Sequence, residues 1–167
     1  MKQIQLIFLL LFGIPCLADA PSNIFTVYLV RHAEKQTDKN DPPLSECGVK
    51  RAQGLAQLLS SVNLKHVYSS DYKRTLSTAA PVANSQNLAV ELYDPKKLEK
   101  IKTTLLNLKQ DVLVVGHGNT TAVLAGMLAK QELEETTYTS YDRVYQVVIY
   151  NNTGRVHLLH DTFKCRA

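Results

Sequence analysis

The feature that most constrains the fold is an alternation of two kinds of segment along the chain. Short runs rich in β-branched and aromatic residues, typical of buried strands, lie at residues 25–30, 66–70, 89–93 and 112–118. Four helices are expected between and after them: one capped by Ser45, one through Ala79 and Ala83, one beginning at Asp94-Pro95, and one over residues 120–130. Such alternation predicts a parallel sheet covered by helices.

The last part of the chain has a different pattern. Residues 143–160 contain two strand-like runs around the turn sequence NNTG, which predicts an antiparallel hairpin. The whole pattern predicts an α/β fold, a three-layer sandwich with a mostly parallel sheet, helices on both faces and a C-terminal antiparallel edge hairpin. A chain of 167 residues without internal repeats is expected to form one domain with a substantial core.

The first twenty residues have the pattern of a targeting segment. Lys2 gives a basic start, an apolar core runs from Ile4 to Ile14, and small residues follow. We expect cleavage after Ala18, so that residues 1–18 are a signal peptide and residues 19–167 are an exported domain, periplasmic or secreted. An uncleaved anchor or a lipid-modified Cys16 is the alternative. The apolar run is shorter than the ~20 residues that span a bilayer, and no membrane span is expected in the mature chain.

Two cysteines, Cys47 and Cys165, would remain after that cleavage. They could pair in an oxidising compartment, but the sequence does not show that they meet, and a chain of this size does not need the bridge. We therefore do not expect it. The formal net charge of +4 is mild, and no cluster of basic and aromatic residues indicates binding to nucleic acid. Nothing in the pattern indicates an oligomeric state.

Basic and imidazole side chains follow three of the predicted strands, where open α/β sheets bind their ligands. Arg31 and His32 end the first strand, Arg74 comes about one helical turn after the second, and His117 stands between two glycines after the fourth. Each residue alone has an ordinary explanation, as a solvated strand end, a surface charge or a turn residue. Their convergence on one sheet edge favours a functional site.

These residue types suit a phosphate site. Arginine pairs with phosphate oxygens bidentately, and a histidine near neutrality can act as a nucleophile or a proton donor. The helix start at Asn119-Thr120 offers backbone N–H groups to an anion. Such a site needs no metal or other cofactor to stabilise a transferring phosphoryl group. A zinc site at His32 and His117 would lack further ligands, and the cysteine motif of zinc deaminases is absent.

Four segments, in their order and spacing, resemble the histidine phosphatase superfamily: LVRHAEK, LSECGVKRAQGLAQLL, VYSSDYKRTLSTAAPVA and VLVVGHGNT. They look like its larger branch, which includes phosphoglycerate mutases and small broad-specificity phosphatases. The resemblance implies that His32 is the nucleophile of a covalent phosphohistidine. It also implies that Arg31 and Arg74 clamp the phosphate, while His117 contacts it from the opposite side. Asn119 is added to the expected substrate-binding residues.

The expected activity is hydrolysis of a small phosphorylated substrate by an exported, metal-independent phosphomonoesterase. A phosphoglycerate mutase-like phosphotransferase is one alternative, and the predicted export argues against it. A catalytically silent phosphate-binding module is the other. It is motivated by a departure from the family pattern, because the glutamate that many relatives use as general acid has no clear counterpart. The residues left open for that role are Glu34, Glu91, Asp94 and Glu99. A smaller departure is Ala33, where the family usually has glycine.

Overall fold

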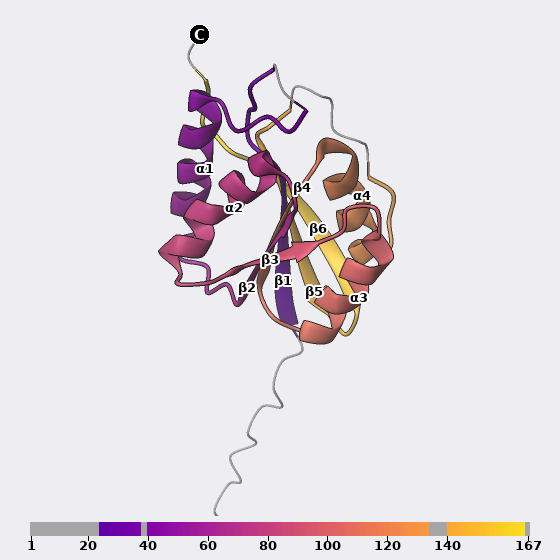
Figure 1. The fold of residues 1–167 in the computed structure, drawn as a ribbon. Helices are drawn as coiled ribbons and strands as arrows, with labels where there is room; N and C mark the ends of the chain where they lie inside the picture. Colours follow the sequence, from indigo (N-terminus) through magenta and orange to yellow (C-terminus); the bar gives the residue numbers. More distant parts are fainter. Residues whose placement is uncertain (1–23, 38–39, 134–139, 166–167) are drawn as a thin grey trace, which may run out of the picture.

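A computed structural model describes residues 24–37, 40–133 and 140–165, and it confirms the expected α/β sandwich (Figure 1). Six strands form one sheet in the order β3-β2-β4-β1-β5-β6. Their bounds are β1 Ile24–Arg31, β2 His66–Ser70, β3 Val90–Tyr93, β4 Val112–Gly116, β5 Arg143–Tyr150 and β6 Thr153–His160. Strands β1 to β4 pair in parallel, and β5 and β6 pair antiparallel at one edge. The predicted signal peptide, residues 1–18, lies outside the described residues.

Four helices cover the two faces of the sheet. Their bounds are α1 Glu46–Leu58, α2 Lys73–Ser85, α3 Leu98–Leu108 and α4 Gly118–Ala129. Helices α1 and α2 pack on one face and contribute Leu55, Ala79 and Val82 to its core. Helices α3 and α4 pack on the other face, where Leu105 and Leu128 are buried. Within the described part of the chain, no helix combines the length and the apolar character that crossing a membrane requires.

Strand β4 lies in the interior of the sheet, between β2 and β1, and all five of its residues are buried. This burial on both faces explains its continuous apolar sequence, because a strand covered by helices on each side has no solvent face. The register places Arg31 opposite Gly116. The carboxyl ends of β1 and β4 therefore meet at the same edge of the sheet, and the residues that follow them are brought together.

Two local predictions are confirmed by backbone geometry. Ser45 caps α1, since its Oγ accepts a hydrogen bond from the N–H of Gly48 at 3.1 Å. The hairpin turns at Asn151 and Asn152, whose φ angles of 48° and 60° lie in the left-handed region. Asparagine tolerates this region, and a two-residue turn of this type matches the twist of the flanking strands.

The predicted helix start at Asp94 is wrong. Helix α3 begins at Leu98, with Lys97 as its N-cap residue. The side chain of Asp94 instead accepts a hydrogen bond from the N–H of Lys96 at 2.9 Å, and its carbonyl accepts one from Lys97 at 3.0 Å. An aspartate that bonds the backbone two residues on stabilises a tight turn, which here precedes the helix.

The expectation that Cys47 and Cys165 do not pair is also wrong, because the structure joins them in a disulfide. After β6 the chain passes back over α1 as residues 161–165, which we call the C-terminal strap. Arg51 of α1 holds the strap, since its Nη1 donates to the Asp161 carboxylate at 3.0 Å and to the Phe163 carbonyl at 3.2 Å. These contacts bring two cysteines that are 118 residues apart together, and no local sequence pattern encodes them.

Candidate active site

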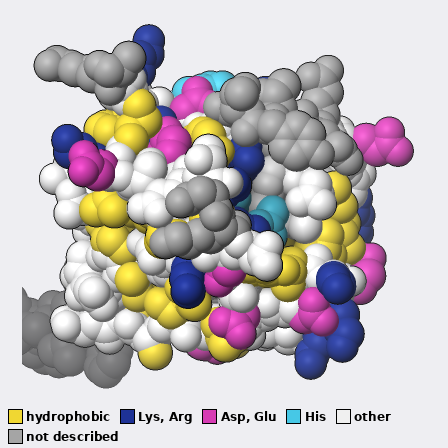
Figure 2. Space-filling model, turned by 45° about the horizontal axis from the view of Figure 1, so that its top comes forward, with side chains coloured by type: hydrophobic (Ala, Val, Ile, Leu, Met, Phe, Trp, Pro, Cys, Tyr) yellow, Lys and Arg dark blue, Asp and Glu magenta, His cyan; other side chains and the backbone are white. Residues whose placement is uncertain are grey.

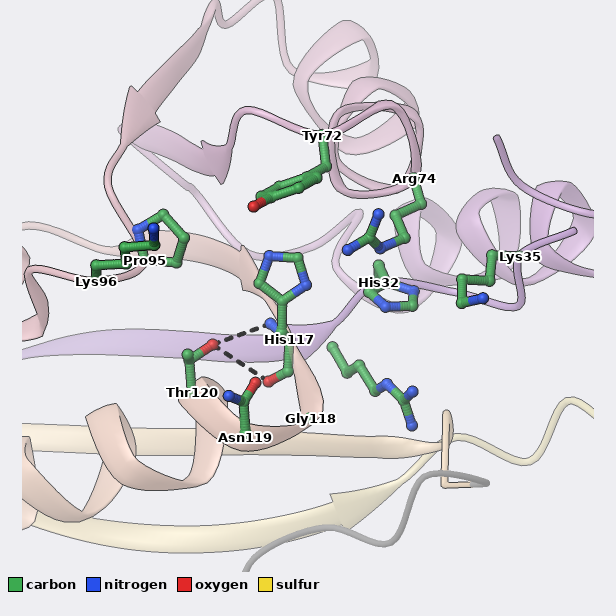
Figure 3. Close-up of a pocket in the computed structure, with 11 residues that line it drawn as sticks. His32, Lys35, Tyr72, Arg74, Pro95, Lys96, His117, Gly118, Asn119 and Thr120 are labelled. Atoms are coloured by element: carbon green, nitrogen blue, oxygen red, sulfur yellow. Dashed lines mark hydrogen bonds between the residues drawn. The ribbon is translucent and has the colours of Figure 1, made fainter. Parts of the chain in front are cut away.

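A pocket of about 440 Å³ opens at the sheet edge where β1 and β4 end. Figure 2 shows this hollow with basic and histidine side chains at its floor. All five residues that the sequence assigned to the site line this pocket: Arg31, His32, Arg74, His117 and Asn119. Figure 3 shows the histidine and Arg74 side chains converging from the ends of separate elements.

His32 is held by its position directly after β1. Its backbone N–H donates to the Gly116 carbonyl at 2.9 Å, which ties the residue to the end of β4. The ring is 3 % exposed, and its Nδ1 lies 2.8 Å from the carbonyl oxygen of Ala33. A carbonyl oxygen only accepts, so Nδ1 carries the proton and Nε2 keeps its lone pair.

Electrostatics favour the neutral form of this ring. Burial lowers the pKa of His32 to about 3, against the opposing effect of the Ala33 hydrogen bond, and the positive charges of Arg31 and Arg74 add to the depression. A neutral imidazole with a free lone pair on Nε2 is the form that can attack phosphorus.

Each of the two arginines is positioned by contact with a tyrosine ring. The Arg31 guanidinium lies over the ring of Tyr141, 4.3 Å from its centre, and its Nη1 contacts the Ser140 carbonyl at 3.4 Å. Arg74, in the first turn of α2, lies 4.5 Å from the centre of the Tyr72 ring. Its Nε is buried and has no hydrogen-bond partner among the described residues. An unpaired buried donor in a cationic pocket favours an anionic ligand.

Thr78 couples the loop of the histidine to the helix of Arg74. Its hydroxyl donates to the Arg74 carbonyl at 2.7 Å and accepts from the N–H of Ala33 at 3.0 Å. This link fixes the spacing between the nucleophile candidate and one of the two cationic clamps. Arg74 is further held by Asp41, with 3.4 Å between Nη1 and the carboxylate.

His117 lies between β4 and α4, as the N-cap residue of the helix. Its Nε2 is 3.0 Å from the Ser70 hydroxyl, and its ring meets that of His32 edge-on, with 5.6 Å between ring centres. Burial and the charges of Arg74 and Arg31 lower its pKa to about 4. The positive end of the α4 dipole points into the same pocket, which again suits an anion.

Sequence reasoning missed four further residues that line the pocket: Lys35, Tyr72, Pro95 and Lys96. Tyr72 lies directly before α2, and its ring packs edge-on against His117 with 5.0 Å between centres. Pro95 and Lys96 come from the turn that Asp94 stabilises. The sequence could have indicated Tyr72, because it lies two positions before Arg74 and follows the end of the same strand, β2.

None of the four carboxylates proposed as general acid lines the pocket. Glu34 is paired with Arg51 at 2.7 Å, and Glu91 lies 2.6 Å from the Nδ1 of His66. Asp94 stabilises its turn, and Glu99 is an exposed side chain of α3. Each of these carboxylates therefore has a structural role or a solvent position, and none lines the pocket at the histidines.

The described residues offer one cluster of metal-type ligands, formed by Glu34, Cys47 and Cys165. Both cysteines are in the disulfide, and a metal requires thiolates. This cluster therefore does not have the chemistry of a metal site.

The fold and the site define an α/β protein with an anion pocket built from two histidines and two arginines. The family model of the histidine phosphatase superfamily, branch 1, matches residues 27–101. Phosphoserine phosphatase 1 of Hydrogenobacter thermophilus is 35% identical over 115 residues, which cover 64% of this chain and 44% of that protein. Fructose-2,6-bisphosphatase TIGAR of Xenopus laevis is 34% identical over 87 residues, covering 46% of this chain and 32% of the relative. The chain spans less than half the length of these curated relatives.

Solved structures share the fold over a larger part of the chain. A mycobacterial glucosyl-3-phosphoglycerate phosphatase superposes with a TM-score of 0.69 at 14% identity, covering 83% of this chain and 100% of that one. The protein histidine phosphatase SixA gives a TM-score of 0.67 at 19% identity, covering 81% and 96%. The match of residues 27–101 to the histidine phosphatase superfamily model contains the first three of the four motifs that carry the resemblance.

Proposed function

We propose that the protein is a phosphatase that hydrolyses phosphoric monoesters through a phosphohistidine at His32. The observation that carries this proposal is the state of that ring, which is buried and neutral with Nε2 available, between two arginine side chains in one pocket. The match of residues 27–101 to the superfamily model, with phosphatases among the relatives, supports the same activity.

The proposed reaction has two steps, formation of the phosphohistidine and its hydrolysis. The lone pair of Nε2 attacks phosphorus, and the bond to the leaving group breaks with its electron pair going to the leaving atom. Arg31, Arg74 and the start of α4 stabilise the charge on the phosphoryl oxygens. Water then attacks phosphorus, the electron pair of the N–P bond returns to Nε2, and dihydrogen phosphate leaves with both protons of the water.

The first test uses 4-nitrophenyl phosphate and detection of the enzyme intermediate in alkali, where a phosphohistidine is stable. Wild-type protein should release nitrophenol, and rapid denaturation in alkali after mixing with labelled substrate should retain label on His32. His32→Ala should lower kcat by at least about 10³-fold and abolish labelling. A silent phosphate-binding module would bind the ester without turnover or label, and either result would contradict the proposed function. A phosphotransferase would instead pass the label to an added acceptor alcohol rather than to water.

The proposed reaction uses no metal. Activity after dialysis against EDTA should stay within about twofold of the untreated enzyme, because two arginines and a helix start supply the positive charge. Loss of activity that Mg²⁺ or Zn²⁺ restores would contradict this part of the proposal.

We also propose that the protein is exported, to the periplasm or the exterior, after cleavage behind Ala18. The basic and apolar start of the sequence and the disulfide both support export, because structural disulfides are typical of oxidising compartments. Cell fractionation and N-terminal sequencing of the mature protein test this. A product that begins at Met1 and stays in the cytosol would overturn it.

A further inference from the structure

The side of the pocket that faces the leaving group differs in composition from the side that faces His32. In an in-line displacement, the leaving atom departs on the side of phosphorus opposite the nucleophile. Figure 3 shows Tyr72, Pro95 and Lys96 beyond His117 when the pocket is viewed from His32. The ring centres of His32 and His117 are 5.6 Å apart, and those of His117 and Tyr72 are 5.0 Å apart. These three residues therefore surround the place of the leaving group.

This side of the pocket has no carboxyl group among the described residues. An alkyl alkoxide is a strong base and needs a proton as it departs, and enzymes usually supply it from a carboxylic acid or a histidinium. In the free protein, burial lowers the pKa of His117 to about 4, which disfavours the protonated ring that a general acid requires. Tyr72 and Lys96 supply no carboxyl group to this side of the pocket.

The same side does carry a positive charge. The Asp94 side chain accepts from the N–H of Lys96 at 2.9 Å and holds the turn that brings this lysine to the pocket rim. The exposed Lys96 side chain places a cation at this rim, and a cation there stabilises an anion that departs without a proton, because it lowers the energy of the charge that develops on the leaving atom. Lys97, the next residue, forms an ion pair with Asp94 at 3.6 Å and does not line this pocket.

We propose that the site takes phosphoryl groups from leaving groups that depart as stable anions, with acyl phosphates as the substrate class, and that Lys96 stabilises the departing anion. The inference rests on the proposed function. In the first step Nε2 of His32 bonds to phosphorus, the P–O bond to the acyl oxygen breaks, and a carboxylate leaves with the electron pair beside Lys96. No proton is transferred in this step, so no general acid is required. Alkyl phosphates, which would expel an alkoxide, are poor substrates.

The experiment measures kcat/KM for 2,4-dinitrophenyl phosphate, acetyl phosphate, 4-nitrophenyl phosphate, phenyl phosphate and glycerol phosphate, in order of increasingly basic leaving groups. The rate constant should fall steeply along the series. Glycerol phosphate should be slower than acetyl phosphate by more than about 10²–10⁴-fold, the contribution that general acid catalysis makes where it operates. Equal rates on glycerol and acetyl phosphate would overturn this inference while leaving the proposed function intact.

The role of Lys96 is tested with Lys96→Gln and the matched control Lys97→Gln. Both changes remove one charge from the same exposed turn, but only Lys96 lines the pocket. Lys96→Gln should lower kcat/KM by about tenfold or more for esters with basic leaving groups, and thus steepen the dependence on leaving-group basicity. Lys97→Gln should leave this dependence unchanged. An equal effect of both substitutions, or an effect of Lys96→Gln that is the same for every ester, would overturn the assignment of Lys96.

Absence of turnover with every ester, together with absence of labelled His32, would overturn the proposed function and this inference with it. Turnover that is fast only with esters of weakly basic leaving groups supports both.

Discussion

The two histidines of the pocket are neutral because they are buried beside two arginines. Burial lowers the pKa of His32 to about 3 and that of His117 to about 4, whereas both rings have ordinary values in the unfolded chain. Each unit of such a depression is worth about 1.4 kcal/mol between the two protonation states. The arrangement that makes Nε2 of His32 available for attack therefore makes the fold sensitive to acid.

This sensitivity gives a pH prediction with a definite sign. Below pH 6.5 the unfolded chain binds protons at both rings, while the folded protein binds them only near pH 4 and pH 3, so stability falls as pH decreases. The free energy of unfolding in urea should decrease by up to about 1.4 kcal/mol per pH unit for each ring between pH 6.5 and 4.

The double variant His32→Gln/His117→Gln should lose most of this slope. His157→Gln is the matched control, because this histidine is exposed on β6, and it should retain the slope. Identical pH dependence of the wild type and the double variant would contradict the neutral, buried state of the pair.

Sequence could predict the four central residues of the site because each follows a strand of a parallel sheet directly or within one helical turn. Tyr72 and Lys96 were missed since their place depends on how the chain turns after β2 and β3. The general acid was left open among four candidates, which were chosen from their positions along the sequence. The structure shows that three of these carboxylates are engaged elsewhere. Glu34 pairs with Arg51, Glu91 lies beside His66, and Asp94 stabilises a local turn.

Helix α1 is in close contact with the loop after β1. A Cβ placed on Gly48 would overlap the carbonyl oxygen of Glu34, two residues after His32. That oxygen also accepts from the N–H of Ser45 at 2.9 Å, so the start of α1 and the loop are in direct backbone contact. Position 48 requires glycine because there is no room for a Cβ atom, and not because of the backbone conformation.

Gly48→Ala should therefore be destabilising by about 1–3 kcal/mol, the usual cost of overpacking. Because the displaced carbonyl lies next to the nucleophile loop, kcat with 4-nitrophenyl phosphate should fall by about tenfold to a hundredfold. Gly54→Ala is the control on the same helix. Its added Cβ would meet nothing within 4 Å, and it should stabilise α1 by about 0.5–1 kcal/mol without changing kcat. Equal effects of the two substitutions would contradict the close contact.

The bounds of helices and strands could be predicted where the local sequence favours a single structure. Strand β2 has the bounds that the sequence indicated, and Ser45 caps α1 as expected. Strands β5 and β6 lie within the predicted residues 143–160, although β6 already begins at Thr153, inside the predicted turn sequence NNTG. The start of α3 was not predictable, because Asp94 can serve either as a helix cap or as the first residue of a tight turn. The structure selects the turn, and Lys97 becomes the cap residue.

At the scale of the whole molecule, the disulfide between Cys47 and Cys165 joins α1 to the end of the described chain. A bridge that closes so long a segment stabilises mainly by restricting the unfolded chain, by about 2–4 kcal/mol. The double variant Cys47→Ser/Cys165→Ser should lose this amount in urea unfolding. Dithiothreitol should lower the stability of the wild type to the same value and leave the variant unchanged. A wild type that is insensitive to the reductant would show that the two cysteines are not paired.

The global architecture followed from the alternation of strands and helices, because only one layered arrangement buries both kinds of apolar surface. The C-terminal strap did not follow, since it depends on contacts of Arg51 with Asp161 and Phe163 that are remote in sequence. Long-range ionic contacts have no periodic signature, which is why the pairing of the cysteines was also missed.

The direction in which β1 runs through the sheet has a consequence for how the molecule can be attached to a surface or to a second protein. Ile24 opens this strand at the end opposite the pocket, because the pocket lies where β1 and β4 end. A molecule immobilised through the chain before Ile24 would face its pocket outward, toward approaching solutes. The disulfide holds Cys165 at the first turn of α1, so a fusion partner added behind Cys165 would stand beside α1. The direction of one strand thus determines which end of the protein can carry a tether.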